Sequence, residues 1–472
     1  MIKEYKAHPL MLLRFIKPFL FVLVIPVIKG IIQYIVEQKI TGVLKLEIMA
    51  FSAIMLVAYL QLRFFKLKLD EKNITLSKGF LLRRTATIDI NKLSSVVSIV
   101  SPIDMICGSV TFRLNTEAGR KGKPDFEFKL YRKDAIEVKK RLYGEEKRAA
   151  VSYSLYRLAL AAALSSSAFT GLIVAVPIIN RIGDLIGIAL SDMLIDEINR
   201  TAQSLNTYLP TIFNIIMIIL IIGYLISFIY TLLRTLNYKL FSGDKHIELR
   251  YGLLIRRKTL FKRKSVNDIC IEQTPFMRIL NRYSMRVAVG GFGDEKGEKA
   301  TIVPICKHFE LKHHLSLGFN FFETEGNVLR AARTRKMYWR FMRIPLNYAV
   351  SVLIAGIIAI LIFPYFDRLI VFIMGVLLIV IAYFASLRSY NYHFGHIQFG
   401  DNISARGSYG VKTRELYCPK EKVGVIKITQ HIYDYKPKTC RVKVIIRSES
   451  ADSVRVRHLN IDSVLENIKN CY

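Results

Sequence analysis

Long apolar runs constrain this chain more than any other feature of its sequence. A transmembrane helix needs roughly 20 mostly apolar residues to cross the hydrocarbon layer. Runs of about this length cover residues 15–36, 46–63, 155–180, 208–233, 345–364 and 369–388. The fourth is the clearest, because no charged residue occurs between Tyr208 and Leu233. The sequence therefore predicts an integral membrane protein with six helical spans.

The first predicted span is the most interrupted, because it contains Lys17, Pro18, Pro26 and Lys29. A lysine can extend its ammonium group from a helix end to the membrane surface, and proline is tolerated in membrane helices. The apolar stretch is too long for a signal peptide, and no small-residue cleavage site follows it. We therefore expect a membrane span here and not a cleaved leader.

The charge of the chain lies mostly outside these spans. Lys and Arg (69) exceed Asp and Glu (37) by 32, yet 52% of the residues are hydrophobic. So apolar a composition argues against a soluble nucleic-acid-binding protein, and 28 Phe with 24 Tyr argue against a disordered basic chain. The spans come in pairs, and the polar stretches 66–148, 234–343 and 388–472 after the pairs have net charges of +8, +13 and +7.

The basic residues also predict the orientation of the chain. Lys and Arg close to span ends stay in the cytoplasm. The connection from 180 to 207 has two basic and four acidic residues, whereas Lys39 and Lys45 in the first turn are an exception to the rule. We therefore expect the polar stretches and both termini in the cytoplasm of a multi-pass cell-membrane protein. The residues that carry this bias before the fifth span are Arg333, Arg335, Lys336, Arg340 and Arg343.

An internal repeat organises the polar stretches. At an offset of 173 residues, ITLSKGFLLRRT (74–85) falls on IELRYGLLIRRK (247–258). A fainter third copy begins at ISARGSYGVKTRE (403–415), and IKITQHIY (426–433) matches ICIEQTPF (269–276). The residues that define the repeat structurally are Gly79 with Gly252, Pro102 with Pro275, and Gln273.

Each copy has the periodicity of short strands. Apolar and polar residues alternate over 110–114 and 126–130, and an amphipathic helix is expected over 134–142, 309–319 and 462–471. Many short antiparallel strands with one C-terminal helix predict a small open β-barrel of pleckstrin-homology (PH) type. The predicted fold class is thus membrane α + β, with three transmembrane hairpins that each lead into a cytoplasmic PH-like barrel capped by its C-terminal helix.

The predicted domain borders follow from this order. Transmembrane hairpins cover 1–65, 149–235 and 331–388, and PH-like domains cover 66–148, 236–330 and 389–472. Within the second hairpin, residues 181–206 have apolar positions three to five apart with acids between them. This pattern is typical of an amphipathic helix on the outer membrane surface or on a partner, although packing over the third and fourth spans would explain it equally well.

The second copy carries the residues that resemble a known family. RYGLLIRRKTL (250–260), followed by the turn EQTP (272–275), resembles the bacterial PH domain of the second type. Three membrane hairpins that each lead into such a domain resemble the YdbT-like multi-pass membrane proteins. The first copy departs from the turn pattern at Val100 and Ser101, and the third has Ile432 in place of the proline.

The resemblance implies a protein of the bacterial envelope. Such proteins are often found with a shorter membrane relative that has a single PH domain, which would be a partner in a hetero-oligomer. Some relatives are linked to protection against membrane-active bacteriocins.

Residues that could carry catalysis are few. His393 and His396 lack the glutamate of an HExxH motif, and His313 adjoins His314, so interfacial histidines are favoured over a metal site. GGFGDEKG (290–297) is not followed by GK[ST], which favours a hairpin turn over a phosphate loop. The six cysteines form no CxxC pair and are interpreted as small hydrophobic residues. We expect no catalytic site, metal or cofactor.

The spans give little sign of a transport path. Ser165, Ser166 and Ser167 in the third span are interpreted as small residues that allow helices to pack closely. No span has the centred acidic residue that is usual in ion-coupled carriers. A transporter or lipid-handling protein stays the alternative function, and a cavity lined by these serines, Asn214 and Tyr224 would favour it.

Basic clusters are the candidate contacts with a membrane or a partner. A solvated strand face would explain them equally well, but each domain is tied to an anionic inner leaflet, where each nearby Lys or Arg contributes about 1 kcal/mol. We therefore expect inner-leaflet lipid as a partner and no nucleic acid. The residues are Arg83, Arg84, Arg256, Arg257, Lys258, Lys262, Arg263 and Lys264 on strands, with Arg335, Lys336 and Arg340 before the fifth span.

The sequence thus favours a non-enzymatic membrane scaffold or interaction protein. Its cytoplasmic domains would bind one another, a partner protein or the inner leaflet. Two of the barrels could pack side by side, so that each buries a sheet edge that would otherwise be exposed.

Overall fold

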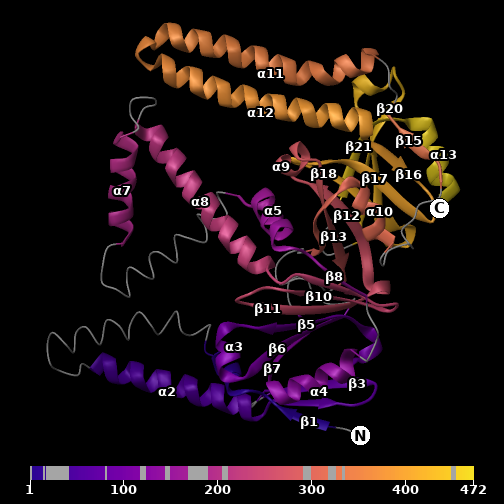
Figure 1. Ribbon diagram of the computed structural model, residues 1–472. Coiled ribbons are helices and arrows are strands. Elements are labelled where there is room, and N and C mark those ends of the chain that lie inside the picture. The colour runs from indigo at the N-terminus through magenta and orange to yellow at the C-terminus, as the bar shows by residue number, and fades with distance from the viewer. Residues whose placement is uncertain are drawn as a thin grey trace. The chain divides into compact units, whose positions relative to one another are not determined.

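The chain forms two compact units in the computed structural model (Figure 1). One unit consists of Met1–Val151, Lys239–Ser265 and Gly290–Lys296, and the other of Ser152–Tyr238, Val266–Val289 and Gly297–Tyr472. The second PH-like repeat therefore contributes strands to both units. The structure describes residues 3–13, 16, 42–79, 82–116, 124–143, 149–167, 190–204, 211–290, 299–316, 326–331, 335–447 and 453–471.

The first repeat consists of two groups of antiparallel strands and a C-terminal helix. The first group is a four-stranded sheet in the order β1-β2-β3-β4, and a short 3-10 turn, η2 (Ile90–Lys92), leads from it into the second group. The first group comprises β1 (Lys3–Lys6), β2 (Lys66–Leu69), β3 (Asn73–Lys78) and β4 (Arg84–Asp89). The second comprises β5 (Leu93–Val100), α3 (Pro102–Cys107), β6 (Ser109–Thr116), β7 (Phe126–Tyr131) and α4 (Arg132–Tyr143).

The second repeat has the same order of elements as the first. Its first group comprises β8 (Ala149–Ser152), β9 (Lys239–Ser242), β10 (His246–Tyr251) and β11 (Arg256–Lys262), followed by the turn η3 (Arg263–Ser265). Its second group comprises β12 (Val266–Gln273), α9 (Pro275–Ile279), β13 (Arg282–Val289), β14 (Ala300–Lys307) and α10 (His308–Ser316).

The third repeat follows the same plan, although its match to the others in sequence is faint. Its first group comprises β15 (Val328–Arg330), β16 (His396–Gln398), β17 (Asn402–Tyr409) and β18 (Lys412–Pro419), followed by the turn η6 (Lys420–Lys422). Its second group comprises β19 (Val423–Thr429), η7 (Ile432–Asp434), β20 (Thr439–Ile446), β21 (Ser453–Asn460) and α13 (Ile461–Cys471).

Local conformation explains why certain residues recur between the repeats. Gly79 and Gly252 follow β3 and β10 with φ of +107° and +100°, a region that side chains with a Cβ rarely adopt. Pro102 and Pro275 occupy the first turns of α3 and α9, where the missing N–H of proline costs no hydrogen bond. In the third repeat Ile432 begins the equivalent turn η7. The repeats therefore share backbone conformation at these positions, even where the residue type differs.

Neighbouring repeats are joined strand to strand. In the first junction, β5 of the first repeat pairs antiparallel with β11 of the second, within a sheet of order β7-β6-β5-β11-β10-β9-β8. In the second junction, β12 pairs antiparallel with β18, within a sheet of order β14-β13-β12-β18-β17-β21-β20-β19. The strands that the structure describes form no closed barrel, and the two junctions lie in sheets that neighbouring repeats share. The open barrel with a helical cap expected for each repeat stays a prediction.

The core of the first repeat lies between its two groups of strands. Alternate residues of β2 and β3 are buried, and Phe112 stacks on Phe128 with ring centroids 5.7 Å apart. Val138 and Leu142 of α4 join the same cluster, and so does Leu260 of β11. The first junction therefore extends the hydrophobic core of one repeat into the next strand of the chain.

Each helical insert begins and ends at two adjacent strands. β1 pairs with β2, β8 neighbours β9, and β15 pairs with β16, so the chain leaves each sheet and returns beside the same place. The first insert contains α2 (Gly42–Arg63), and the second contains α5 (Leu155–Ser165), α7 (Leu190–Ser204) and α8 (Thr211–Thr235). The third contains α11 (Arg335–Ile362) and α12 (Asp367–Phe394), joined by the short turn η5 (Pro364–Phe366).

Three described helical segments are long and apolar enough to cross a membrane: Asn214–Thr235, Phe341–Ile362 and Pro364–Phe394. They coincide with the fourth, fifth and sixth predicted spans. Figure 1 shows α11 and α12 side by side along their length, and a Cβ on Gly356 of α11 would lie 2.6 Å from the sulfur of Met374. The third insert is therefore a closely packed helical hairpin.

The other predicted spans have different outcomes. The first lies outside the described residues, apart from Ile16, and the second is represented by the apolar segment Phe51–Arg63 of α2. The predicted third span is not one continuous helix, because α5 ends at Ser165 and Ser166 has extended backbone. Its remainder, from residue 168, lies outside the described residues. α7 falls within the predicted amphipathic segment 181–206.

Candidate functional site

The matching basic clusters of the first two repeats lie in different surroundings. Arg83 and Arg84 are exposed at the start of β4. The cluster Arg256–Lys258 begins β11, opposite Ser98–Val100 of β5 in the first junction. Among the described strands, one cluster therefore lies at the edge of a sheet, and its counterpart lies in a strand that is paired on both sides.

Lys258 shows what the first junction does to a half-buried cation. Burial lowers the pKa of Lys258 to about 8, and the positive charges of Lys139 and Arg250 act in the same direction. Removing an ammonium group from water next to other cations disfavours its charged form. Lys258 therefore weakens the junction at neutral pH and is poorly placed to act as a solvated membrane contact.

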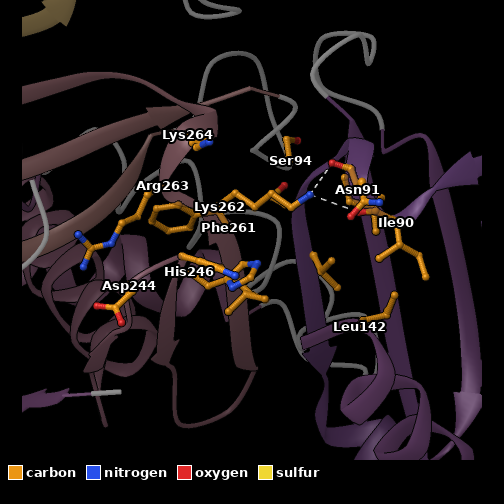
Figure 2. Close-up of a pocket in the computed structure, with 15 residues that line it drawn as sticks. Ile90, Asn91, Ser94, Leu142, Asp244, His246, Phe261, Lys262, Arg263 and Lys264 are labelled. Atoms are coloured by element: carbon orange, nitrogen blue, oxygen red, sulfur yellow. Dashed lines mark hydrogen bonds between the residues drawn. The ribbon is translucent and has the colours of Figure 1, made fainter. Parts of the chain in front are cut away.

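A cavity of about 480 Å³ lies beside the first junction, and Figure 2 shows the side chains that line it. The Lys262 ammonium reaches across the cavity and donates to the backbone carbonyl oxygens of Asn91 at 2.6 Å and Ile90 at 3.3 Å. Arg263 is directed away from those two residues and donates to the Ser242 hydroxyl at 2.9 Å. Lys262 therefore holds the two repeats together, Arg263 bonds within its own repeat, and the exposed Lys264 lies at the same cavity.

A second cavity, of about 370 Å³, lies where α12 meets the third repeat. Arg388 of α12, Lys443 of β20 and both Arg455 and Arg457 of β21 converge on it. None of the described residues that line this cavity is acidic. We refer to these four residues and their cavity as the arginine pocket.

Strand register brings like charges together at the arginine pocket. In the pairing of β20 with β21, Lys443 lies opposite Arg455 and Arg441 lies opposite Arg457. Like charges directly opposite each other destabilise an antiparallel pair. Burial, together with the charges of Arg441, Arg388 and Arg455, lowers the pKa of Arg457 to about 10. An anion in the cavity would relieve this repulsion.

The helix contributes its arginine in a fixed position. Nη1 of Arg388 donates to the backbone oxygen of Phe341 at 3.2 Å, and its guanidinium lies 5.9 Å from the centre of the Phe341 ring. Asn391, one turn further along α12, donates to the Ser408 hydroxyl at 2.6 Å. These contacts tie the end of the helical hairpin to the sheet at the arginine pocket.

The sequence contains a signal for this pocket in the spacing of basic residues, although they do not form continuous clusters. Arg441 and Lys443 are two residues apart, and so are Arg455 and Arg457, which is the spacing of side chains on one face of a strand. Two such segments in adjacent strands predict a basic sheet face. The pairing of the strands, which brings the two faces together, could not be obtained from the spacing.

The remaining predicted contact and repeat residues lie at the start of a helix or within the second junction. Arg335, Lys336 and Arg340 lie in the first turns of α11, and their side chains are outside the described part of the chain. The Gln273 amide donates to the backbone oxygen of Arg282 at 3.0 Å and accepts from the Thr413 hydroxyl at 3.2 Å. Gln273 therefore ties β12 to both of its neighbouring strands.

The candidate catalytic residues also pack as structural groups. Cys270 and Cys418 are buried, and burial raises the pKa of each thiol to about 12, which makes both poor nucleophiles at neutral pH. His314 is buried beside the ring of Tyr153. The strands on either side of GGFGDEKG pair antiparallel, as a hairpin requires, and residues 291–298 lie outside the described part.

The three serines end a helix. The hydroxyls of Ser165 and Ser166 donate to backbone oxygens of α5, and the backbone N–H of Ser167 donates to Ser227 of α8 at 3.2 Å. The Tyr224 hydroxyl donates to the backbone oxygen of Ala163 at 2.8 Å. Among the described residues, these groups line neither of the two cavities above.

Comparison with known proteins gives one family. The model of a family described as bacterial PH domain matches residues 13–146 and 188–317, which together make up more than half of the chain. No curated protein and no solved structure matches the chain. Each matched segment covers part of a helical insert and the strands that follow it in the chain. The chain therefore belongs to the bacterial PH domain family, with two segments matched by the family model and a third repeat of the same strand order.

Proposed function

We propose that this protein is a non-enzymatic membrane scaffold whose PH-like repeats lie on the cytoplasmic face of the cell membrane and bind anionic headgroups there. The arginine pocket is the observation that carries the proposal. Arg388, Lys443, Arg455 and Arg457 surround one cavity without an acidic lining residue. A phosphate group offers the oxygen acceptors that guanidinium groups pair with most strongly.

The position of Arg388 on its helix supports a lipid as the source of the phosphate. Arg388 follows Arg368 by 20 residues in α12, which is about 30 Å along a helix and equals the hydrocarbon thickness of a bilayer. With Arg368 at one surface, Arg388 lies at the headgroup level of the other. The arginine pocket would then face the layer in which lipid phosphates lie.

The strand pairs at the ends of the inserts support the multi-pass topology. Adjacent strands lie about 4.8 Å apart, so an insert that starts at β15 and returns at β16 begins and ends on one side of the membrane. The same holds for the inserts that start at β1 and β8. Each insert would therefore cross an even number of times, which fits three pairs of spans, and the bias of basic residues supports a cytoplasmic position for the repeats and both termini.

The scaffold role rests on the repeats and their junctions. Three PH-like repeats joined by paired strands offer a rigid surface to a partner, for which the resemblance suggests a shorter membrane relative with one PH domain. Envelope defence, such as resistance to membrane-active bacteriocins, would be the physiological setting of such a scaffold. The signal expected in cells is increased sensitivity to these agents when the protein is deleted.

Lipid binding is tested on the full chain in detergent by thermal unfolding with added phosphatidylglycerol, phosphatidylcholine or inorganic phosphate. The wild type should gain more stability from phosphatidylglycerol than from phosphatidylcholine. If the lipid is the ligand, inorganic phosphate should stabilise the protein less than phosphatidylglycerol does. If free phosphate is the ligand, the two should stabilise it equally. Each basic residue near an anionic surface is worth about 1 kcal/mol, so Arg455→Gln with Arg457→Gln should remove most of the gain.

The matched control is Lys436→Gln with Lys438→Gln, which removes two charges from exposed positions of the same repeat. The control should keep the response to phosphatidylglycerol. An equal response in the wild type, the control and the Arg455→Gln/Arg457→Gln variant would show that the arginine pocket does not bind the lipid.

A further inference from the structure

The two junctions between repeats are the same interaction. A bulge interrupts β5 at Ser94, β12 at Asn267 and β19 at Gly424, which fixes the alignment of the three strands. On this alignment, Val96 opposite Leu260 in the first junction corresponds to Ile269 opposite Tyr417 in the second. In both junctions, the strand that opens the second group of one repeat (β5 or β12) pairs with the strand that closes the first group of the following repeat (β11 or β18). The two pairs have the same register.

Two equivalent strands have no such partner within the part of the chain that the structure describes. β4, the last strand of the first group in repeat 1, pairs there with β3 alone. β19, the first strand of the second group in repeat 3, pairs there with β20 alone. Repeat 1 thus presents one half of a junction on β4, and repeat 3 presents the other half on β19.

The burial of the strands shows the effect of a missing partner. Every residue of β12 is buried, and six of the eight in β5 are. In β19 no residue is buried, and Val425 is 55% exposed although its counterparts Ser95 and Asp268 are buried. β4 is likewise exposed or half-buried throughout. An unpaired edge with apolar side chains is a template for a further strand.

We infer that β19 of one chain pairs with β4 of a second copy of the same chain and forms a third junction in the register of the other two. Continuity with the two junctions inside the chain selects this occupant. The register places Ile426 opposite Thr87, Lys427 opposite Ala86 and Thr429 opposite Arg84 of the second copy.

The side chains are compatible with this register. Ile426 and Ile428 already pack on the core of repeat 3, and the partner strand would cover their open side. Lys427 meets an alanine, Arg84 meets a threonine and Asp89 meets Gly424, so no like charges lie directly opposite each other. The pairing would therefore bury apolar surface without placing like charges opposite each other across the new junction.

The contact is heterologous, because each copy uses a different strand. Such contacts generate closed rings or open filaments and not a two-fold dimer. Both strands belong to PH-like repeats, so the assembly would extend along the membrane surface. The inference concerns contacts between chains and holds whether or not the arginine pocket binds lipid.

Disulfide cross-linking between differently tagged copies tests the register. Lys427→Cys in one copy and Ala86→Cys in the other would lie opposite each other, where Cα atoms of an antiparallel pair are about 4.5–5.5 Å apart, within disulfide range. All variants would carry Ser at Cys107, which is exposed, and at Cys471. Co-expression and mild oxidation in membranes should give a product that carries both tags.

Lys443→Cys is the matched control for Lys427→Cys. Lys443 lies opposite Lys427 on β20, one strand further from the free edge, so it would be about 10 Å from Ala86, beyond disulfide range. It should give at most a trace of the two-tag product. Equal yields from Lys427→Cys and Lys443→Cys, or no product from either, would overturn the inference.

A double variant separates pairing between copies from pairing within one chain. Lys427→Cys and Ala86→Cys in the same chain should give cross-linked oligomers under the same oxidation. A disulfide confined to single chains, with no product from the mixed single variants, would show that the edge is closed within the chain and that a second copy is not the occupant.

A charge substitution tests the junction without cross-linking. In the second junction the buried Glu272 carboxylate lies 3.1 Å from Arg414, and the equivalent pair in the third junction is Thr429 with Arg84. Thr429→Glu should increase the oligomer fraction of the purified full chain at a fixed concentration, and Thr429→Lys should reduce it. Arg84→Glu should reverse the gain of Thr429→Glu, whereas an unchanged oligomer fraction in all three variants would contradict the pairing.

Discussion

At the scale of single residues, this protein holds several cations in places that disfavour their charge. Arg457 lies among Arg441, Arg388 and Arg455, and Lys258 lies beside Lys139. A cation that is partly removed from water and has other cations as neighbours reduces the stability of the fold. The repulsion at Arg457 could be relieved by an anion, because the arginine pocket contains a cavity. Lys258 belongs to a paired strand, so its repulsion would be relieved by loss of its proton.

Lys258 gives a prediction with a defined pH dependence. Its folded-state pKa of about 8 is below the ordinary 10.5, so the unfolded chain binds more protons between these values and stability rises with pH in that window. Lys258→Met removes this half-buried charge and should raise the melting temperature of the full chain in detergent at pH 7. The difference between variant and wild type should shrink as the pH rises from 8 toward 10.

Thermal unfolding at several pH values provides the measurement, with Lys264→Met as a control at an exposed position two residues past the end of β11. The control should change the melting temperature little at any pH. A constant difference between Lys258→Met and wild type from pH 7 to pH 10 would show that the charge of Lys258 is not the cause.

At the scale of elements, equivalent strands have different environments because of what lies beside them. β5 and β12 are buried by their partners β11 and β18, whereas β19 has the same place in its repeat and is exposed. The second junction adds a charged network to its apolar contacts. The Glu272 carboxylate is almost fully buried and is surrounded by Arg286, Arg414 and Lys412 at 3.6, 3.1 and 3.5 Å.

Glu272 should therefore be essential for the stability of the second junction. Burial raises its pKa, but the three surrounding cations together hold the pKa of Glu272 below its usual range. Glu272→Gln would leave these cations without a counter-charge, and breaking a buried network in this way costs about 3–5 kcal/mol. Denaturant unfolding of the full chain should show this loss. Glu421→Gln, at an exposed position, should change the unfolding free energy by less than about 0.5 kcal/mol.

The sequence predicted the repeat itself better than the way in which repeats are joined. The matched glycines and prolines could be found because they are required by local geometry, a positive φ or the first turn of a helix. The C-terminal helices could be found because their amphipathic pattern is local too. The junctions depend on which strand lies at the edge of another repeat, and β19 carries no sequence mark that distinguishes it from the paired β5. The short strands β1, β8 and β15 were not predicted, since three or four residues give too little periodicity.

The candidate site shows the same limit. The clusters at Arg256 and Lys262 were visible as runs of basic residues, and the structure uses both at the first junction. The arginine pocket combines residues from α12, β20 and β21 that lie up to about 70 positions apart. Its components are ordinary in the sequence, and only the pairing of the strands beside the helix brings them to one cavity.

At the scale of the whole molecule, this chain alternates helical inserts with strands that join its repeats. Each insert leaves and re-enters its sheet at adjacent strands, so that the insert can cross the membrane without separating the strands on either side of it. The repeats are thereby joined to each other by hydrogen bonds and held by the inserts. All three repeats should then lie on one side of the membrane.

Cysteine labelling in intact cells tests this claim most directly. In a chain with Ser at Cys107 and Cys471, single cysteines would replace Arg83 in repeat 1, Lys436 in repeat 3 and Met193 in α7, all of which are exposed. A membrane-impermeant maleimide should label the α7 position in intact cells, and should label the two repeat positions only after the inner membrane is permeabilised. Labelling of either repeat position in intact cells, at the rate of the α7 position, would contradict the account.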